Sequence, residues 1–475
     1  MKNAFASACL VAIASLCLLA CAEDAPEDAA SEETAALAAT PATRLGELEY
    51  GSLLKPRGAF SGAPLWVSNN PEDVGSFGLL SSTRPPTRAM SPRSSAPEAP
   101  APELTSEDES LLAASQPGCP RGEVRTLDVY VAHILSSARL RGARRLSVVV
   151  EAGARPTSVR WGGSLGTTGW SDARGLKTTR ADWLGAKVAD FRLRQAEGKG
   201  TLTNTASLAP GQRTTLASVT AESLVEGALH LETEGGCVAV HVVTHAGDLE
   251  GPLPAYASGD VKWPGWKDGV GYGRAAGMYQ GSTWRGTAEA TITRAKSALG
   301  WRLFDAAHSP KALVRHGDSA AVLFGGYGVV YEARVELVNA TDQCVSARFA
   351  FTSYANLAPR PGAAALGDRR TPSVASLGTS DASRRPSMLW NGPVSIRQEL
   401  RGGVFAEGRQ DVILKPSLRP EEERDSLGVP ADLSRPLFRW EMNAGERRSA
   451  VVRIPVPGYV VAPAALTVES TPCDR

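Results

Sequence analysis

The segment ALHLETE (residues 228–234), GG (235–236), CVAVHVVT (237–244) carries a clear strand signal and predicts the fold class of this chain. Its apolar and β-branched residues favour extended backbone. The Gly235-Gly236 pair between the two runs is the kind of two-residue loop that hairpin turns favour. We therefore predict two strands joined by a tight hairpin at this point.

Strand-forming runs continue in both directions from this hairpin. Pro210-Gly211 marks a turn between two of them, and residues 443–446 give a second hairpin signal. Many strands, Gly/Pro turns and few helical periods predict an all-β fold of two β-sandwich domains, immunoglobulin-like or jelly-roll-like. The runs cover residues 127–135 (apolar on both faces), 146–151, 201–207, 214–219, 288–293, 320–324, 329–338, 345–352, 394–400, 412–414, 437–442 and 449–456.

The first twenty residues have the order of features that is typical of an export signal. Lys2 gives a short positive start, and residues 8–20 form an apolar run without charge. The run is too short to span a bilayer, which needs about 20 apolar residues. It ends in Leu18-Leu19-Ala20-Cys21, which resembles the lipobox of bacterial lipoproteins.

The lipobox resemblance implies cleavage before Cys21 and acyl chains on its sulfur and its new amino group. Several acyl chains hold a protein stably to a membrane. Ordinary signal cleavage, with Cys21 incidental, is the alternative. Ala22 follows instead of an acidic residue, which favours the outer membrane. We expect a lipid-anchored protein of the cell envelope, on the periplasmic or extracellular side.

Changes of composition predict the organisation of the rest of the chain. Residues 22–48 are rich in Ala, Glu, Asp, Thr and Pro, which is typical of a disordered tether. We predict the following segments: signal peptide 1–20; lipidated Cys21 and tether 21–60; a short strand and Asn-Asn-Pro turn 61–80; a Pro/Ser-rich linker 81–118; a first β-sandwich 119–250; and a second β-sandwich 251–475 with a long loop at 358–388.

Four cysteines remain outside the signal and anchor: Cys119, Cys237, Cys344 and Cys473. An even number of widely spaced cysteines in an oxidising compartment predicts two disulfides. Four cysteines allow three pairings, and the sequence alone does not choose among them. We favour Cys119–Cys237 and Cys344–Cys473, because each pair closes one predicted domain.

The segment LWVSNNPE (65–72) resembles the opening of an uncharacterised family of exported bacterial proteins, the domain-of-unknown-function family thirty-three seventy. Matching features are a strand ending at His133 and the Pro210-Gly211 turn before Leu216. The resemblance covers most of residues 64–460, and the Pro-rich insertion at 81–118 departs from it. The family has no established activity, so the resemblance implies no catalytic residue.

The Gly- and aromatic-rich stretch 249–288 is the candidate ligand-binding segment. Its members Trp263, Trp266, Tyr272 and Trp284 would stack on sugar rings if their faces were exposed. The alternative is that these side chains fill the core between the two domains, because Trp is highly buried on average.

No catalytic motif is recognised, and we expect no cofactor. The sequence has no H-E-x-x-H and no P-loop. His241 and His245 share one face of a predicted strand and, with Asp248, form a weak metal-ligand set, so we expect no metal site. Asp260 and Asp268 are carboxylates of the kind a glycosidase uses, but sequence does not give their separation.

The charge balance argues against nucleic acid as a partner. Lys plus Arg number 51 and Asp plus Glu number 50, and the basic residues are scattered. We therefore expect a non-enzymatic, surface-anchored binding or scaffold protein. Its lipid would bind the membrane, and its folded part would bind a polysaccharide or an envelope protein. The alternative is a carbohydrate- or cell-wall-binding protein, and a glycan hydrolase is less favoured.

Overall fold

The structure is a computed structural model in which residues Pro41–Arg475 form one compact unit. Cys21, the predicted loop at 358–388, and most of the predicted linker at 81–118 lie outside the described residues. The described residues are 53–84, 110, 113–114, 116–135, 140–168, 184–222, 224–249, 251–254, 256–257, 275–304, 308–316, 319, 322–323, 326–353, 390–399, 405–414, 436–457 and 464–473.

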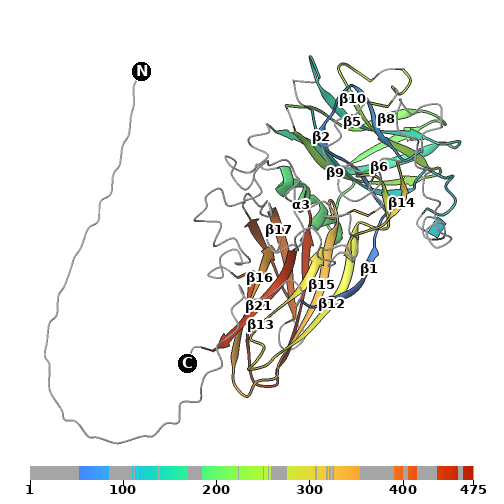
Figure 1. The fold of residues 1–475 in the computed structure, drawn as a ribbon. Helices are drawn as coiled ribbons and strands as arrows, with labels where there is room; N and C mark the ends of the chain where they lie inside the picture. Colours follow the sequence, from blue (N-terminus) through green and yellow to red (C-terminus); the bar gives the residue numbers. More distant parts are fainter. Residues whose placement is uncertain are drawn as a thin grey trace, which may run out of the picture. The chain divides into compact units, whose positions relative to one another are not determined.

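The strands form four sheets, which confirms the predicted all-β, sandwich-like fold (Figure 1). The seven-stranded sheet has the order β14 (Ala312–Arg315), β11 (Ala275–Tyr279), β2 (Leu65–Asp73), β4 (Thr126–Ile134), β9 (Leu224–Glu234), β6 (Thr157–Thr168), β7 (Asn204–Leu208). A four-stranded sheet has the order β3 (Gly78–Ser82), β10 (Val238–His245), β5 (Arg145–Ala152), β8 (Arg213–Thr220). We name these two sheets the first sandwich.

The second sandwich consists of the other two sheets. Its six-stranded sheet has the order β1 (Arg57–Ser61), β12 (Thr283–Ile292), β15 (Val330–Asn339), β20 (Arg447–Pro455), β17 (Trp390–Glu399), β18 (Phe405–Leu414). Its four-stranded sheet has the order β13 (Ala298–Phe304), β21 (Ala464–Pro472), β16 (Val345–Ser353), β19 (Phe438–Met442).

Strand β4 has both faces buried, as its unbroken apolar sequence predicts. Val129 and Val131 pack into the core of the first sandwich. Tyr130 and Ala132 point the other way, into a core that continues through the second sandwich. Successive side chains of a strand alternate between faces, so an apolar run on both faces requires a cover on each.

The two predicted hairpins, at Gly235-Gly236 and at residues 443–446, are wrong, although their strands exist. Gly235-Gly236 joins β9 of the seven-stranded sheet to β10 of the four-stranded sheet. The Pro210-Gly211 turn joins β7 to β8, and residues 443–446 join β19 to β20, again between different sheets. Each turn crosses from one sheet to the facing sheet, because both strands bury a face in the same core and their edges pair elsewhere.

Sheet membership also differs from the predicted boundary at residue 250. Strands β11 and β14 follow that boundary but pair in the seven-stranded sheet beside β2. Strand β1 begins at Arg57, inside the predicted tether, and pairs with β12. Composition reports local polarity, whereas the sheet partner of a strand is set by complementary surfaces distant in sequence.

Residues 61–80 contain most of two strands, β2 and β3, instead of one. The Asn69-Asn70-Pro71 segment lies inside β2, where the pairing with β4 changes register between Asn70 and Asp73. Pro71 has no N–H to donate, so a ladder irregularity at this point accommodates it. The predicted turn is therefore an irregular stretch of strand.

The segment predicted as a linker connects two strands of the same sandwich, the first, and does not join two domains. It follows β3 and precedes β4, and the Thr83 hydroxyl donates to the Gly122 carbonyl at 2.7 Å. Two disulfides are formed, Cys119–Cys237 and Cys344–Cys473, and these are the pairs that we favoured. The first of them fixes the returning chain to β10.

Helix α3 (Leu184–Ala196) was not predicted from the sequence. It packs on β6 and β9 of the first sandwich and on β17 and β20 of the second, and Figure 1 shows it between the two. Among the described residues, no helix has the length and apolar character that crossing a membrane requires.

Candidate functional site

The aromatic stretch does not provide an exposed Trp284. This side chain is 1% exposed, and its ring lies 5.2 Å from that of His308 and 5.9 Å from that of Tyr331 between centroids. The core alternative therefore holds for Trp284. Trp263, Trp266 and Tyr272, like Asp260 and Asp268, lie outside the described residues.

The three residues of the weak metal set are engaged separately. His241 contacts Ser82, and His245 contacts Ser147 at 2.8 Å. The Asp248 carboxylate pairs with Arg145 at 2.7 Å. Within the described ranges, no three His, Cys, Asp or Glu side chains lie close enough together to hold a metal ion.

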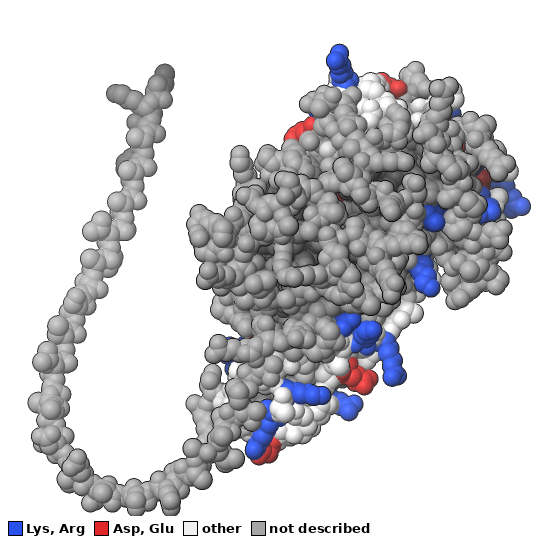
Figure 2. Space-filling model, in the orientation of Figure 1, with Lys and Arg blue, Asp and Glu red and all other residues white. Residues whose placement is uncertain are grey.

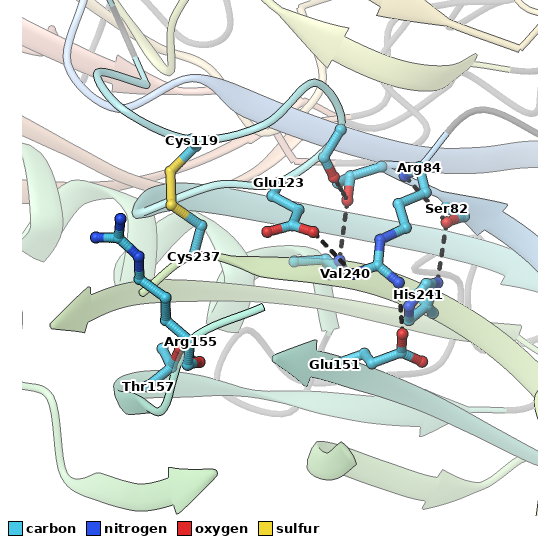
Figure 3. A network of polar contacts seen from close by, with 12 residues as sticks. Ser82, Arg84, Cys119, Glu123, Glu151, Arg155, Thr157, Cys237, Val240 and His241 are labelled. Carbon is cyan, nitrogen blue, oxygen red and sulfur yellow. Dashed lines mark hydrogen bonds and ion pairs between the residues drawn. A yellow bond between two sulfur atoms is a disulfide. The ribbon is translucent and has the colours of Figure 1, made fainter. Parts of the chain in front are cut away.

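A polar network covers the edge of β10 beside the Cys119–Cys237 disulfide (Figure 3). The Arg84 guanidinium lies between Glu123, at 2.9 Å, and Glu151. Burial alone would lower the pKa of Arg84, but the two carboxylates outweigh it and raise that pKa. These two ion pairs of Arg84 hold the chain in place directly after the end of β3.

His241 belongs to the same network but has the properties of a structural histidine. Its Nδ1 lies 2.9 Å from the Ser82 Oγ. Burial first, and then the charges of Arg84 and Arg213, lower the pKa of His241 to about 3. A histidine with that pKa is a poor general base near neutral pH, so the Ser82–His241 pair lacks the property of an activated nucleophile.

A cleft of about 600 Å³ lies beside helix α3. Its walls come from the exposed face of the helix, from Lys199 to Thr203 after it, and from Pro393 of β17 and Arg409 of β18. Gly163 of β6 and Phe191, a partly buried residue that also packs against the hydrophobic core, complete the lining. This volume is in the range of small-molecule sites.

Gly163 makes the close packing in the lining of the cleft feasible. Its φ is +102°, and a Cβ there would lie 2.2 Å from the Ala228 carbonyl and 2.9 Å from the Phe191 ring. Only glycine tolerates this conformation with so little space. The absence of a side chain at Gly163 therefore allows the Phe191 ring of helix α3 to pack closely against β6.

A row of alternating charges joins helix α3 to β18 along the cleft. Asp190 accepts from Arg194 Nε and from Arg409 Nη1, each at 2.8 Å. Glu197 accepts from Arg409 Nη2 at 2.7 Å and from Lys199 at 3.2 Å. We call these five residues the ion-pair row. Burial opposes the charge on Arg409, but Glu197 and Asp190 outweigh it and raise the pKa of Arg409.

Comparison with known proteins adds no relative that would assign this cleft. No protein-family model matches the chain, and no curated protein matches it.

Lys187 is the cationic lining residue that stands apart from the ion-pair row. It lies in the first turn of α3, is exposed, and makes no ion pair within the described part of the chain. On the face shown in Figure 2, the described basic side chains are dispersed, with acidic ones among them. Among the described lining residues, Lys187 is thus the cation without a carboxylate partner.

The opposite face of α3 holds a buried charge cluster. Arg192 is 1% exposed; its Nη1 lies 2.6 Å from Asp128 Oδ1, and its Nε donates to the Gly328 carbonyl at 2.8 Å. Burial alone would raise the pKa of Asp128, but Arg192 and His230 hold it well below its usual range. Asp128 belongs to the first sandwich and Gly328 precedes β15 of the second, so Arg192 connects the two.

No helix was predicted over residues 184–196, so the cleft residues on it were not predicted either. A helical signal was present: Leu184, Val188 and Phe191 recur at the four- and three-residue spacing of one helix face. Asp190 and Arg194 also have the i, i+4 spacing of a helical ion pair. The contribution of Arg409, more than 200 residues later, had no sequence signal.

Proposed function

We propose that this protein is a lipid-anchored, non-enzymatic binding protein of the cell envelope, and that it binds a carbohydrate in the cleft beside helix α3. The observation that carries the proposal is the cleft itself. It combines the volume of a small-ligand site with an aromatic ring, Phe191, and a wall of hydrogen-bonding side chains. Proteins recognise sugars by stacking the ring on an aromatic side chain and hydrogen bonding its hydroxyls.

Binding fits the side chains of the cleft better than hydrolysis does. Among the described lining residues, Asp190 is the only carboxylate, and each of its oxygens accepts from an arginine. A glycosidase of the usual kind needs two carboxyl groups on either side of the scissile bond, one of them able to carry a proton. The described lining offers no such pair.

The anchoring part of the proposal rests on the lipobox at residues 18–21. We expect the full chain produced in a bacterium to incorporate radiolabelled fatty acid and to sediment with membranes. The Cys21→Ala variant should do neither. Equal labelling of both forms would remove the anchor from the proposal.

The binding part is tested with residues 41–475, the compact unit. The fragment is applied to a glycan array and to purified peptidoglycan, beside an Ala186→Trp variant. Ala186 lines the cleft, so a tryptophan there should fill it without removing an existing contact. Thr220→Trp, on the exposed end of β8, is the matched control.

Binding that is lost in Ala186→Trp and retained in Thr220→Trp would locate a carbohydrate site in the cleft. No binding by a fragment that unfolds cooperatively would refute the proposed ligand. Equal binding by both variants would place the carbohydrate site elsewhere.

A further inference from the structure

We propose that the cleft selects an acidic saccharide, one that bears a carboxylate or a phosphate, and that Lys187 is the residue that recognises its charge. This inference rests on the proposed carbohydrate function and names the class of sugar. The inference follows from the balance of hydrogen-bond donors and acceptors along the cleft.

The charged lining is dominated by donors. In the described part of the lining, four side chains are cationic and one, Asp190, is a carboxylate; the cations are Lys187, Arg194, Lys199 and Arg409. Asp190 uses one oxygen for Arg194 and the other for Arg409. A cationic ligand would therefore have to displace an arginine, whereas an anionic ligand finds unused N–H groups.

The ion-pair row also fixes the direction of its cations. Arg409 has five N–H donors, of which one on Nη1 goes to Asp190 and one on Nη2 goes to Glu197. The Glu197 side chain is 2% exposed, so it anchors Arg409 from below the surface. A guanidinium held in this way loses little freedom when a further acceptor binds.

Lys187 supplies the charge that the row does not neutralise. Arg194, Arg409 and Lys199 already face Asp190 and Glu197, and Lys199 also lies 3.5 Å from Glu407. Lys187 has no such carboxylate among the residues that the structure describes. An anion in the cleft would gain its net electrostatic attraction from this ammonium group.

The size of the cleft and its aromatic lining residue favour a sugar over a free anion. About 600 Å³ is far more than an inorganic phosphate or an acetate ion fills. The lining includes an aromatic residue, Phe191, and a hydroxyl-bearing residue, Thr201, which are residue types that stack on and hydrogen-bond to sugars.

The test measures binding to residues 41–475 by calorimetry with matched pairs of sugars. One pair is galacturonic acid trisaccharide and galactose trisaccharide; the other is mannose 6-phosphate and mannose. The two pairs distinguish a carboxylate from a phosphate as the recognised group. Inorganic phosphate and acetate alone are the controls for the anion without its sugar.

We expect the acidic member of at least one pair to bind more tightly than its neutral partner, with an affinity that falls as salt is raised. Lys187→Gln should weaken the acidic sugar about fivefold, the effect of an exposed ion pair. It should leave the neutral sugar unchanged. Lys296→Gln, in the turn between β12 and β13, is the charge-matched control and should change neither.

Two outcomes would overturn the inference, and they differ in what else they affect. Equal affinity for acidic and neutral sugars, unchanged by Lys187→Gln and lost in Ala186→Trp, would reject charge recognition and retain the carbohydrate site. Absence of binding by every sugar, or binding by inorganic phosphate as tight as by mannose 6-phosphate, would reject both the inference and the proposed function.

Discussion

Helix α3 carries an arginine–carboxylate system on each of two opposite faces, and the two differ in burial. On one face, Arg192 and Asp128 are almost completely inaccessible to solvent. On the other face, the Arg409 side chain is 36% exposed and the Asp190 side chain is 28% exposed. The same chemical pair therefore occurs in a buried junction between two sandwiches and at the wall of an open cleft.

The difference in burial determines which ion pairs stabilise the fold and which are able to contact a ligand. A buried charge that loses its partner cannot be rescued by water, so Arg192 and Asp128 must remain paired for the junction to persist. An exposed pair exchanges easily with water and with other ions. The ion-pair row is thus able to share its donors with a ligand, whereas the Arg192 cluster is committed to the fold.

The largest expected effect is the removal of Asp128. Asp128→Ala leaves the Arg192 guanidinium buried without its carboxylate, and we expect a loss of about 3–5 kcal/mol in the free energy of unfolding. Urea titration of residues 41–475 measures it. The double variant Asp128→Ala/Arg192→Met should be less destabilised than Asp128→Ala alone, because it removes the unpaired charge. A double variant as unstable as the sum of both single variants would contradict the importance of charge pairing.

The second prediction concerns the pH dependence of the buried cluster. Burial opposes the charged form of His230, but the Asp128 carboxylate outweighs it and raises the pKa of His230. A group whose pKa is higher in the folded state adds to the free energy of unfolding. This contribution is fully present below the unfolded-state pKa of about 6.5 and disappears as the pH rises through the folded-state pKa. His230→Gln should therefore cost about 1 kcal/mol more near pH 5.5 than near pH 9. Urea titrations at the two pH values measure the difference, and an equal cost at both would show that His230 does not titrate with folding.

A substitution in the exposed ion-pair row should lower the free energy of unfolding less than one in the buried cluster, and the loss should depend on salt concentration. Arg409→Gln leaves Asp190 with Arg194 and leaves Glu197 with Lys199. We expect a cost of about 1 kcal/mol or less, because Arg409 is more than a third exposed and screened by solvent. The cost should shrink as salt is raised, which thermal unfolding at low and high ionic strength measures. A cost as large as that of Asp128→Ala would remove the distinction between the two faces.

The smallest expected effect on stability belongs to Lys187. It is exposed and has no ion pair in the described residues, so Lys187→Gln should change the free energy of unfolding by less than about 0.5 kcal/mol. Urea titration beside the wild-type fragment checks this. If the variant is strongly destabilised, Lys187 has a structural role, and its effect on binding cannot be attributed to ligand charge.

The sequence predicted much of the fold but little of the site. Strands β4, β5, β9 and β10 fall within a few residues of their predicted ranges, because alternation and β-branching are local properties. The favoured cysteine pairs are the pairs that the structure forms. The predicted site failed at Trp284, since a tryptophan that packs in a core and one that stacks on a ligand have the same sequence signal.

The sequence by itself determined the positions of many strands, β4, β10, β15 and β16 among them, several of the turns, and which cysteines are available to pair. Only the tertiary structure decided that the turns at Gly211, Gly236 and Gly445 connect facing sheets, and that β11 and β14 return to the sheet of β2. The physical reason is that side-chain alternation records which face of a strand is buried, whereas its edges pair with whichever backbone the packed core brings alongside. The cleft follows from the same rule, since Arg409 of β18 and Asp190 of helix α3 are 219 residues apart in sequence and are brought together by the packing of the sheets.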